Sequence, residues 1–281
     1  MPAKIARKNN ALYSRAVRLS GLFVYPIKAC GGIALDHADV VERGLAFDRR
    51  YMLVDRTGTF ITQREVPRLC LAKTAFERDS IVVSRPDAAP LELPRALGAQ
   101  AGFERHVYQV WDSFGSALCH PEGSRWFSEF LNDEVSLLYM PDAERRAVNP
   151  ARARPGDIVS FADGYPLLLI SEASLADLNA RLEAPLQMRR FRPNFVISEC
   201  EPYAEDAFTT LQIGGVAFRA VKRCDRCVVT TIDPDTGERG KEPLRTLSHY
   251  RLFEHKVWFG MNLIHDGSGT LRVGDAVRLL P

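Results

Sequence analysis

The sequence predicts an α+β fold that is mainly β, built as two domains with a few flanking helices. Many short segments rich in β-branched and aromatic residues alternate with turn signals, and this is typical of strands. Only a few segments place apolar residues at helical spacing. A polar stretch rich in Pro and Gly, residues 141–166, divides the chain as a domain junction would. With 281 residues and 46% hydrophobic content, the chain can bury the cores of two medium domains.

The first part of the chain predicts mostly strands. Residues 1–16 are basic and lack the apolar core of a secretory signal, so we interpret them as a flexible arm. A mitochondrial presequence is the alternative, but this segment has little Ser and no amphipathic face. Strands are expected over residues 17–28, 50–55, 81–84, 106–111 and 135–140, and an amphipathic helix over 123–132. Many short strands in one stretch suggest a small barrel or sandwich.

The second part, from about residue 145, predicts both helices and strands. Ser171 is placed to cap a helix over 171–183, and a second helix is expected over 243–253. Strands are expected over 194–198, 209–215, 216–222 and 227–233, and hairpins over 263–280.

Composition and motif absences exclude several classes of protein. A net charge of +2 gives no support for a nucleic-acid partner or a membrane surface. The longest apolar runs are far shorter than the roughly 20 residues of a membrane span. Six scattered cysteines without a secretion signal predict free thiols in the cytoplasm. The sequence has no phosphate-binding P-loop, dinucleotide fingerprint, His-Glu-x-x-His motif or nucleophile elbow.

The pair Cys224 and Cys227 has three interpretations from spacing alone. A zinc site would need further ligands, and a thioredoxin-like pair would need a helix after the strand, whereas residues 227–233 favour a strand. The third interpretation is that both side chains only pack in the core. Basic neighbours such as Arg226 favour the thiolate form, which binds soft metals.

Basic residues also collect where strands are expected to begin or end. Arg192 and Asn194 stand at the start of a strand and could hold an anion, and Lys28 precedes a small residue and two glycines that could let a phosphate approach. Of the neighbours Arg49 and Arg50, strand alternation turns one inward. That arginine needs an anionic partner, either a carboxylate such as Asp48 or Glu65, or a ligand.

Taken together, these segments resemble a known family. "YPIKACGG", "GLAFDRRYMLVD" and "ITQREVPRL" resemble the N-terminal β-barrel domain that precedes MOSC domains. "LLLISEASLADLN", "FRPNFVI", "RCDRCVVTTIDPDTGE" and "VGDAV" resemble the MOSC domain itself. The resemblance implies two β-barrel-like domains, over 17–145 and 146–281. The relatives it suggests are the mitochondrial amidoxime-reducing component and its bacterial counterparts, which are molybdenum-cofactor enzymes that reduce N-hydroxylated compounds.

The resemblance also implies a site between the two domains. Cys227 would be the metal ligand of a molybdenum cofactor whose other sulfurs come from the pterin dithiolate, and Cys224 a neighbour. The cofactor-binding residues that it implies are Lys28, Ala29, Arg49, Gly164, Tyr165, Ser171, Arg192, Asn194 and Asn262. Ala29 replaces a serine of relatives, Gly164 and Tyr165 replace a Thr-Ser pair, and Asn262 replaces a tyrosine. The family is also associated with pyridoxal phosphate binding.

Asp235 follows Cys227 in an Asp-Pro-Asp-Thr-Gly turn and has two interpretations. It could be a catalytic proton donor or could orient a reacting group, but the interpretation as a turn former is favoured.

The leading hypothesis is a molybdenum-dependent oxidoreductase that reduces amidoximes, hydroxylamines or N-hydroxylated bases. The remaining cysteines lack the spacing of an iron-sulfur cluster, so electrons are expected from a separate ferredoxin-, flavoprotein- or cytochrome-type protein. The alternative is a carrier of molybdenum cofactor or of persulfide sulfur on Cys227. A third interpretation is a binding module whose cysteines are structural.

Overall fold

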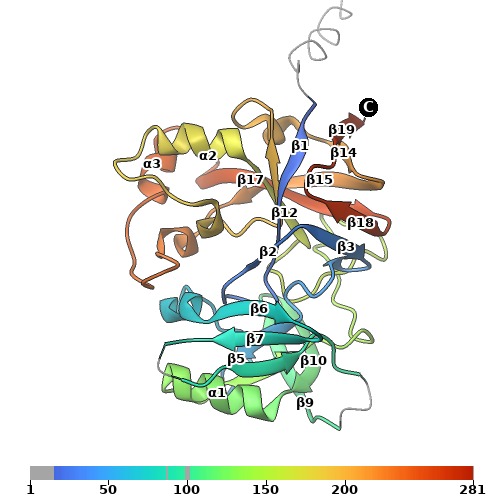
Figure 1. Ribbon diagram of the computed structural model, residues 1–281, viewed down its shortest axis with the longest axis vertical. Helices are drawn as coiled ribbons and strands as arrows, with labels where there is room; N and C mark the ends of the chain where they lie inside the picture. Colours follow the sequence, from blue (N-terminus) through green and yellow to red (C-terminus); the bar gives the residue numbers. More distant parts are fainter. Residues whose placement is uncertain (1–15, 87, 99–101, 281) are drawn as a thin grey trace, which may run out of the picture.

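The computed structural model describes residues 16–86, 88–98 and 102–280 (Figure 1). The arm expected over 1–16 therefore lies outside the described residues, apart from Ala16. The described residues form a mainly β structure with three α-helices, which confirms the predicted fold class. Within these ranges, no helix is long and apolar enough to cross a membrane.

The helices and strands follow one another in short segments. The α-helices are α1 (Pro121–Leu131), α2 (Glu172–Asn179) and α3 (Leu244–Ser248). The 3₁₀ helices are η1 (Pro67–Leu71), η2 (Met188–Arg190), η3 (Ala204–Ala207) and η4 (Val228–Thr231). The strands are β1 (Arg18–Val24), β2 (Ile33–Leu35), β3 (His37–Val41), β4 (Gly44–Leu45), β5 (Tyr51–Val54), β6 (Lys73–Glu77), β7 (Ser80–Ser84), β8 (Leu91–Pro94), β9 (Arg105–Val110), β10 (Ser113–Cys119), β11 (Ser136–Tyr139), β12 (Leu167–Ser171), β13 (Phe195–Ser198), β14 (Thr210–Ile213), β15 (Val216–Asp225), β16 (Leu252–Phe253), β17 (Lys256–Asp266), β18 (Gly269–Arg272) and β19 (Val277–Leu280).

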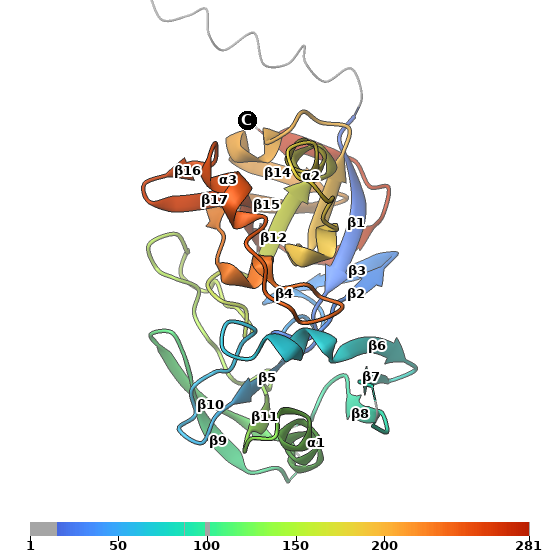
Figure 2. The same ribbon diagram turned by 90° about the vertical axis from the view of Figure 1, so that its left-hand side faces the viewer.

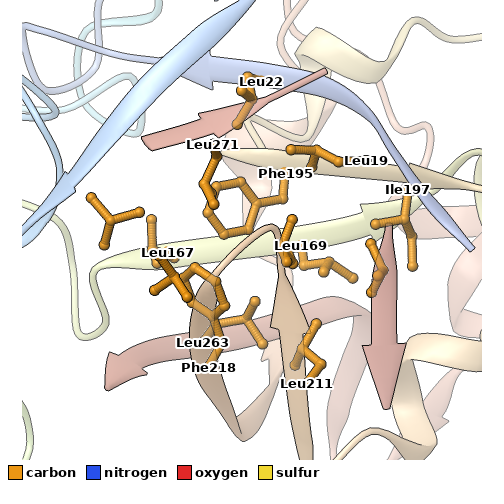
Figure 3. Close-up of a cluster of buried hydrophobic side chains, with 14 of the residues drawn as sticks. Leu19, Leu22, Leu167, Leu169, Phe195, Ile197, Leu211, Phe218, Leu263 and Leu271 are labelled. Atoms are coloured by element: carbon orange, nitrogen blue, oxygen red, sulfur yellow. The ribbon is translucent and has the colours of Figure 1, made fainter. Parts of the chain in front are cut away.

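A nine-stranded sheet forms the upper half of the molecule in Figure 1. Its order is β19-β14-β15-β17-β12-β13-β1-β2, and β16 pairs with β17. The pair β12 and β13 is parallel, and the other pairs are antiparallel. The cluster of buried side chains in Figure 3, which includes Leu19, Phe195 and Leu263, forms the core of this half. Each such side chain stabilises the fold by about 1.5–3 kcal/mol through burial.

The lower half contains a four-stranded sheet, β5-β11-β10-β9, and a three-stranded sheet, β6-β7-β8 (Figures 1 and 2). Helix α1 packs its buried residues Phe127 and Phe130 into the core of this half. The helix begins two residues before the predicted start, because Pro121 suits the first helical position and His120 Nδ1 accepts the Gly123 N–H at 3.1 Å.

Strands from the beginning of the chain lie in the upper half. β1 pairs with β13, and β3 pairs with β18, although the predicted boundary between the domains is near residue 145. A single cut of the chain at that boundary does not separate the two halves, because it would divide the nine-stranded sheet.

Two predicted elements are wrong. Residues 227–233 do not form a strand, because the chain turns into η4 directly after Cys227. Thr230 Oγ1 donates to the Cys227 carbonyl at 3.0 Å, and Thr231 Oγ1 donates to the Val228 carbonyl at 2.8 Å, which stabilises this turn. The helix predicted over 243–253 is only the short α3, and β16 follows it.

Candidate functional site

A cavity of about 190 Å³ lies between the two halves and is lined by residues from both. Nine of the site residues predicted from the sequence line this one cavity: Lys28, Ala29, Arg49, Gly164, Tyr165, Arg192, Asn194, Cys227 and Asn262. Segments far apart in the sequence therefore meet at the place where the resemblance puts the site.

Cys227 presents an exposed thiol to the cavity. It directly precedes η4, and its Sγ lies 4.0 Å from Arg64 Nη1. The neighbouring Cys224 is half-buried, and its Sγ accepts a hydrogen bond from Arg226 Nη1 at 3.1 Å. All six cysteines are free, so the pair is not a disulfide. Among the described residues, no three His, Cys, Asp or Glu side chains gather closely enough to hold a metal by themselves. A metal at Cys227 would thus need most of its ligands from another molecule.

Lys28 lies at the bottom of the cavity, where its Nζ donates to the Phe161 carbonyl at 2.8 Å and forms an ion pair with Asp163. Burial lowers the pKa of Lys28 to about 8, although Asp163 opposes this shift. Desolvation would raise the pKa of Asp163, but its side chain is 56% exposed, and the charge and hydrogen bond of Lys28 lower the pKa to about 2. At neutral pH the pair is therefore ionised.

Arg49, and not its neighbour Arg50, lines the cavity. Its Nη1 pairs with Asp48 and donates to Asn194 Oδ1 at 3.0 Å. Arg50 turns away and donates to the Met140 carbonyl at 3.0 Å. The expected carboxylate partner of the inward arginine is therefore Asp48.

Arg192 is a further cation in the cavity wall and is half-buried. Its Nη1 donates to the Cys30 carbonyl at 2.6 Å, and its guanidinium lies 4.3 Å from the centre of the Tyr25 ring. Arg49 lies 4.5 Å from the same ring, so both cations contact one aromatic side chain. Burial lowers the pKa of Arg192 and raises the pKa of Tyr25 to about 12, which keeps the phenol neutral.

Asn194 connects this cation pair to the sheet of the upper half. Its Oδ1 accepts the Leu168 N–H at 3.2 Å in addition to Arg49, and its Nδ2 donates to the Phe23 carbonyl at 3.1 Å. These bonds use both polar atoms of the side chain within the protein. Asn194 is therefore held in place by β12 and β1, and it orients Arg49.

The positions that depart from the family pattern differ in what they offer the cavity. Ala29 has a positive φ of 70°, and its carbonyl accepts from Gln63 Nε2 at 2.5 Å. Asn262 Nδ2 donates to the Lys222 carbonyl at 3.1 Å. Tyr165 brings a phenol whose pKa is raised by burial, whereas Gly164 brings only its backbone.

Two predicted site residues lie elsewhere. Ser171 is fully buried and caps α2, where its Oγ accepts the Ser174 N–H at 3.0 Å. Asp235 does not line the cavity and forms an ion pair with Arg189, whose hydrogen bond lowers the pKa of Asp235. A carboxylate held ionised in this way is a poor proton donor at neutral pH, so the structure favours the interpretation of Asp235 as part of a turn.

The cavity also contains polar residues that the sequence analysis did not assign to the site. They are Thr62, Gln63, Arg64, Asp163, Asp225, Arg226 and Thr230. Arg64 stands in "ITQREVPRL", a segment quoted for the resemblance, so its motif could have identified it. Asp163 lies in the stretch interpreted as a domain junction, and nothing in its local pattern distinguishes it.

Positive charge exceeds negative charge around the cavity. The lining cations are Lys28, Arg49, Arg64, Arg192 and Arg226, and the lining carboxylates are Asp163 and Asp225. Arg226 Nε is buried and has no hydrogen-bond partner in the described part of the chain. Buried cations without carboxylate partners are costly unless a ligand neutralises them. An anionic ligand with a phosphate group and a thiolate-seeking metal fits this set of donors.

The chain is similar to proteins of a known family. The chain matches the model of the MOSC N-terminal beta barrel domain over residues 16–134 and that of the MOSC domain over residues 156–278. It is 33% identical to the human protein named mitochondrial amidoxime-reducing component 1, over 97% of this chain and 86% of that protein. It is 36% identical to rat mitochondrial amidoxime reducing component 2, over 92% of this chain and 82% of that protein. A tomato molybdenum cofactor sulfurase is 31% identical over 92% of this chain, which spans 35% of the sulfurase.

Proposed function

The chain belongs to the family that joins a MOSC N-terminal β-barrel domain to a MOSC domain and includes the mitochondrial amidoxime-reducing components, and from this membership we propose a specific activity. A function associated with the molybdenum cofactor follows from the family itself. The proposed activity is reduction of N-hydroxylated compounds, such as amidoximes, hydroxylamines or N-hydroxylated bases. Electrons would come from a separate ferredoxin-, flavoprotein- or cytochrome-type protein, and the proposed location is the cytoplasm.

The observation that carries this proposal is the exposed Cys227 thiol in a cavity with an excess of cations. The cavity provides the exposed sulfur of Cys227 for a soft metal and several cations for a phosphate. Cys227 Sγ would ligate the metal, and Lys28, Arg49 and Arg192 would hold the anionic part of the cofactor. When bound, the cofactor supplies the two-electron reduction that breaks the N–O bond.

The side chains of this protein bind, orient and supply protons. Asn194 and Asp48 fix the guanidinium of Arg49, and the Tyr25 ring supports Arg49 and Arg192 from one side. Reduction of an N-hydroxyl group to an amine or amidine consumes two electrons and two protons and releases water. Lys28 Nζ, with a pKa of about 8, holds a proton inside the cavity at neutral pH.

Metal and pterin content per chain test the proposal first. Wild type expressed in a cofactor-competent host should carry near-stoichiometric molybdenum and pterin and should reduce benzamidoxime with an artificial electron donor. Cys227→Ala should lose the metal and the activity, because the sulfur ligand that the protein would supply is removed. Cys224→Ala is the matched control and should keep the metal. Wild type without either component would contradict the proposal.

A second function has one observation in its favour. The match to a molybdenum cofactor sulfurase covers 92% of this chain, and Cys227 is exposed enough to carry a persulfide or to deliver cofactor. A carrier would release sulfur as thiocyanate on treatment with cyanide and would not turn over benzamidoxime. Persulfide on wild type, absent from Cys227→Ala and accompanied by no reductase activity, would favour this function.

A further inference from the structure

A second cavity, of about 260 Å³, adjoins the first cavity, which contains Cys227. Gln63, Arg192 and Val229 line both cavities and form their common wall. The rest of the second cavity is built from β1, β2 and β6 and from the 3₁₀ helices η1, η2 and η4. Segments from both ends of the chain therefore enclose a space that the site at Cys227 does not use.

Positive charge exceeds negative charge around the second cavity. The cations that line it are Lys73, Arg189, Arg190 and Arg192. Among the residues that the structure describes, no Asp or Glu side chain lines it. Two carboxylates outside the lining bind these cations: Asp235 pairs with Arg189 and lies 3.6 Å from Lys73, and Asp233 accepts from Arg190 at 2.8 Å. Four cations against two carboxylates leave two positive charges in excess.

Arg190 and Arg192 keep N–H donors for a ligand. The Arg190 side chain is 11% exposed and donates one N–H to Asp233. Arg192 donates to the carbonyl of Cys30 at 2.6 Å and lies over the ring of Tyr25, neither of which is an anion. Because a guanidinium has five N–H donors, both arginines can still donate to a phosphate in the cavity.

The remaining wall of the second cavity is largely apolar. Phe23, Val229, Ile232 and Pro234 contribute apolar side chains to it. Burial raises the pKa of the Cys70 thiol, which also lines the cavity, so this thiol stays neutral and does not repel an anion. Sites for small organic molecules combine apolar walls with a few charged groups in this way.

We propose that the second cavity binds a small organic anion that carries a phosphate group on an apolar body. The phosphate would bind Lys73 and Arg190, and the apolar body would lie against Phe23 and Ile232. This site lies beside the chemistry at Cys227 and does not depend on the proposed activity. Because Arg192 lines both cavities, the ligand would contact a wall of the first cavity as well.

The test measures the binding of three probes by calorimetry: phenyl phosphate, inorganic phosphate and phenol. The protein is expressed in a cofactor-competent host. Lys73→Gln and Arg190→Gln each remove a cation that lines the second cavity but not the first. Lys73 is 46% exposed, so its substitution should preserve the fold even if Arg190→Gln does not. Arg64→Gln is the matched control, because Arg64 lines the first cavity but not the second.

Phenyl phosphate should bind wild type at least about tenfold more tightly than inorganic phosphate or phenol, because it offers both a ring and a charge. Its affinity should fall by about tenfold in Arg190→Gln and about threefold in Lys73→Gln, whereas Arg64→Gln should match wild type. The inference would be overturned if phenyl phosphate did not bind, or bound no more tightly than either other probe. An equal loss of affinity in Arg64→Gln and Lys73→Gln would also overturn it.

Reduction of benzamidoxime separates this inference from the proposed function. Wild type that binds phenyl phosphate in the predicted pattern but reduces no benzamidoxime would contradict the proposed function and leave the second site standing. Wild type that reduces benzamidoxime but does not bind phenyl phosphate would support the function and refute the second site.

Discussion

Lys28 sets how the charge of the cavity responds to pH. Its pKa of about 8 means that the ammonium loses its proton between pH 7 and pH 9. Sulfate keeps a constant charge in this range, so calorimetry of sulfate binding to cofactor-free protein reports the change in the protein. The affinity should fall by up to about tenfold between pH 7 and pH 9. Lys28→Arg, which stays charged, should remove this dependence, and a pH-independent wild type would contradict the assignment.

The same pKa fixes the sign of the effect of Lys28 on stability. The folded-state pKa of about 8 lies below the unfolded value of 10.5, so the folded protein releases this proton first. The contribution of Lys28 to the free energy of unfolding therefore increases as pH rises from about 8 to 10.5. Asp163, whose pKa is lowered to about 2 from 3.8, contributes stability that is lost as pH falls through that interval.

We predict that substitution of Asp235 has no effect on catalysis. Its carboxylate pairs with Arg189 outside the cavity and is 55% exposed. Asp235→Asn should leave the pH profile of kcat/KM for benzamidoxime unchanged and should cost at most about 1 kcal/mol of stability, as exposed ion pairs do. A fall in kcat/KM at rising pH that is present in wild type and absent from Asp235→Asn would show that this carboxyl donates a proton.

The identities of several cavity residues were predictable from the sequence, but their partners were not. The residue types and motifs of Lys28, Arg192 and Cys227 indicate a binding site, and these residues do line the same cavity. The place of Asp163 in the cavity could not be predicted, because its polar and Gly-containing neighbours are equally typical of a linker. The hydrogen bonds of Asn194 to Leu168 and Phe23 depend on tertiary packing, which no local pattern reports.

At the scale of elements, strong local patterns predicted position well and weak ones did not. The start of α2 at Ser171 was predictable, because a serine hydroxyl that accepts from the third residue of a helix is a local interaction. The β-branched residues after Cys227 predict a strand that does not form. Two of them are threonines, and their hydroxyls bond to the backbone and stabilise a 3₁₀ helix instead.

Ser171 gives the prediction that belongs to this scale. Ser171→Ala removes the acceptor of the Ser174 N–H and should lower the free energy of unfolding by about 1–2 kcal/mol. Urea denaturation measures this loss. At a temperature about 20 °C below its midpoint of thermal unfolding, Ser171→Ala should contain as much molybdenum as wild type, because Ser171 would act only on stability. Loss of metal with an unchanged free energy of unfolding would instead show that Ser171 takes part in cofactor binding.

At the scale of the whole molecule, we expect the two halves to depend on each other for folding, because β1 pairs with β13. A fragment of residues 146–281 would lack β1, which covers β13 and contributes Leu19 and Leu22 to the core of the upper half. An exposed strand edge and an incomplete core favour aggregation. We expect this fragment to be insoluble or molten by circular dichroism and NMR, whereas co-expression with residues 1–145 should restore a soluble complex. A folded, monomeric fragment would show that the halves are independent.

The pairing of β1 with β13 also sets an order of events during synthesis. β1 leaves the ribosome early, but β13 and then Cys227 are made only after most of the chain, so the first strand waits without its partner. Contacts between residues so distant in sequence slow folding, and unpaired strands need protection in the meantime. The cavity wall also needs Asn262, which is translated after Cys227, so a cofactor could bind the complete cavity only once both residues have been made.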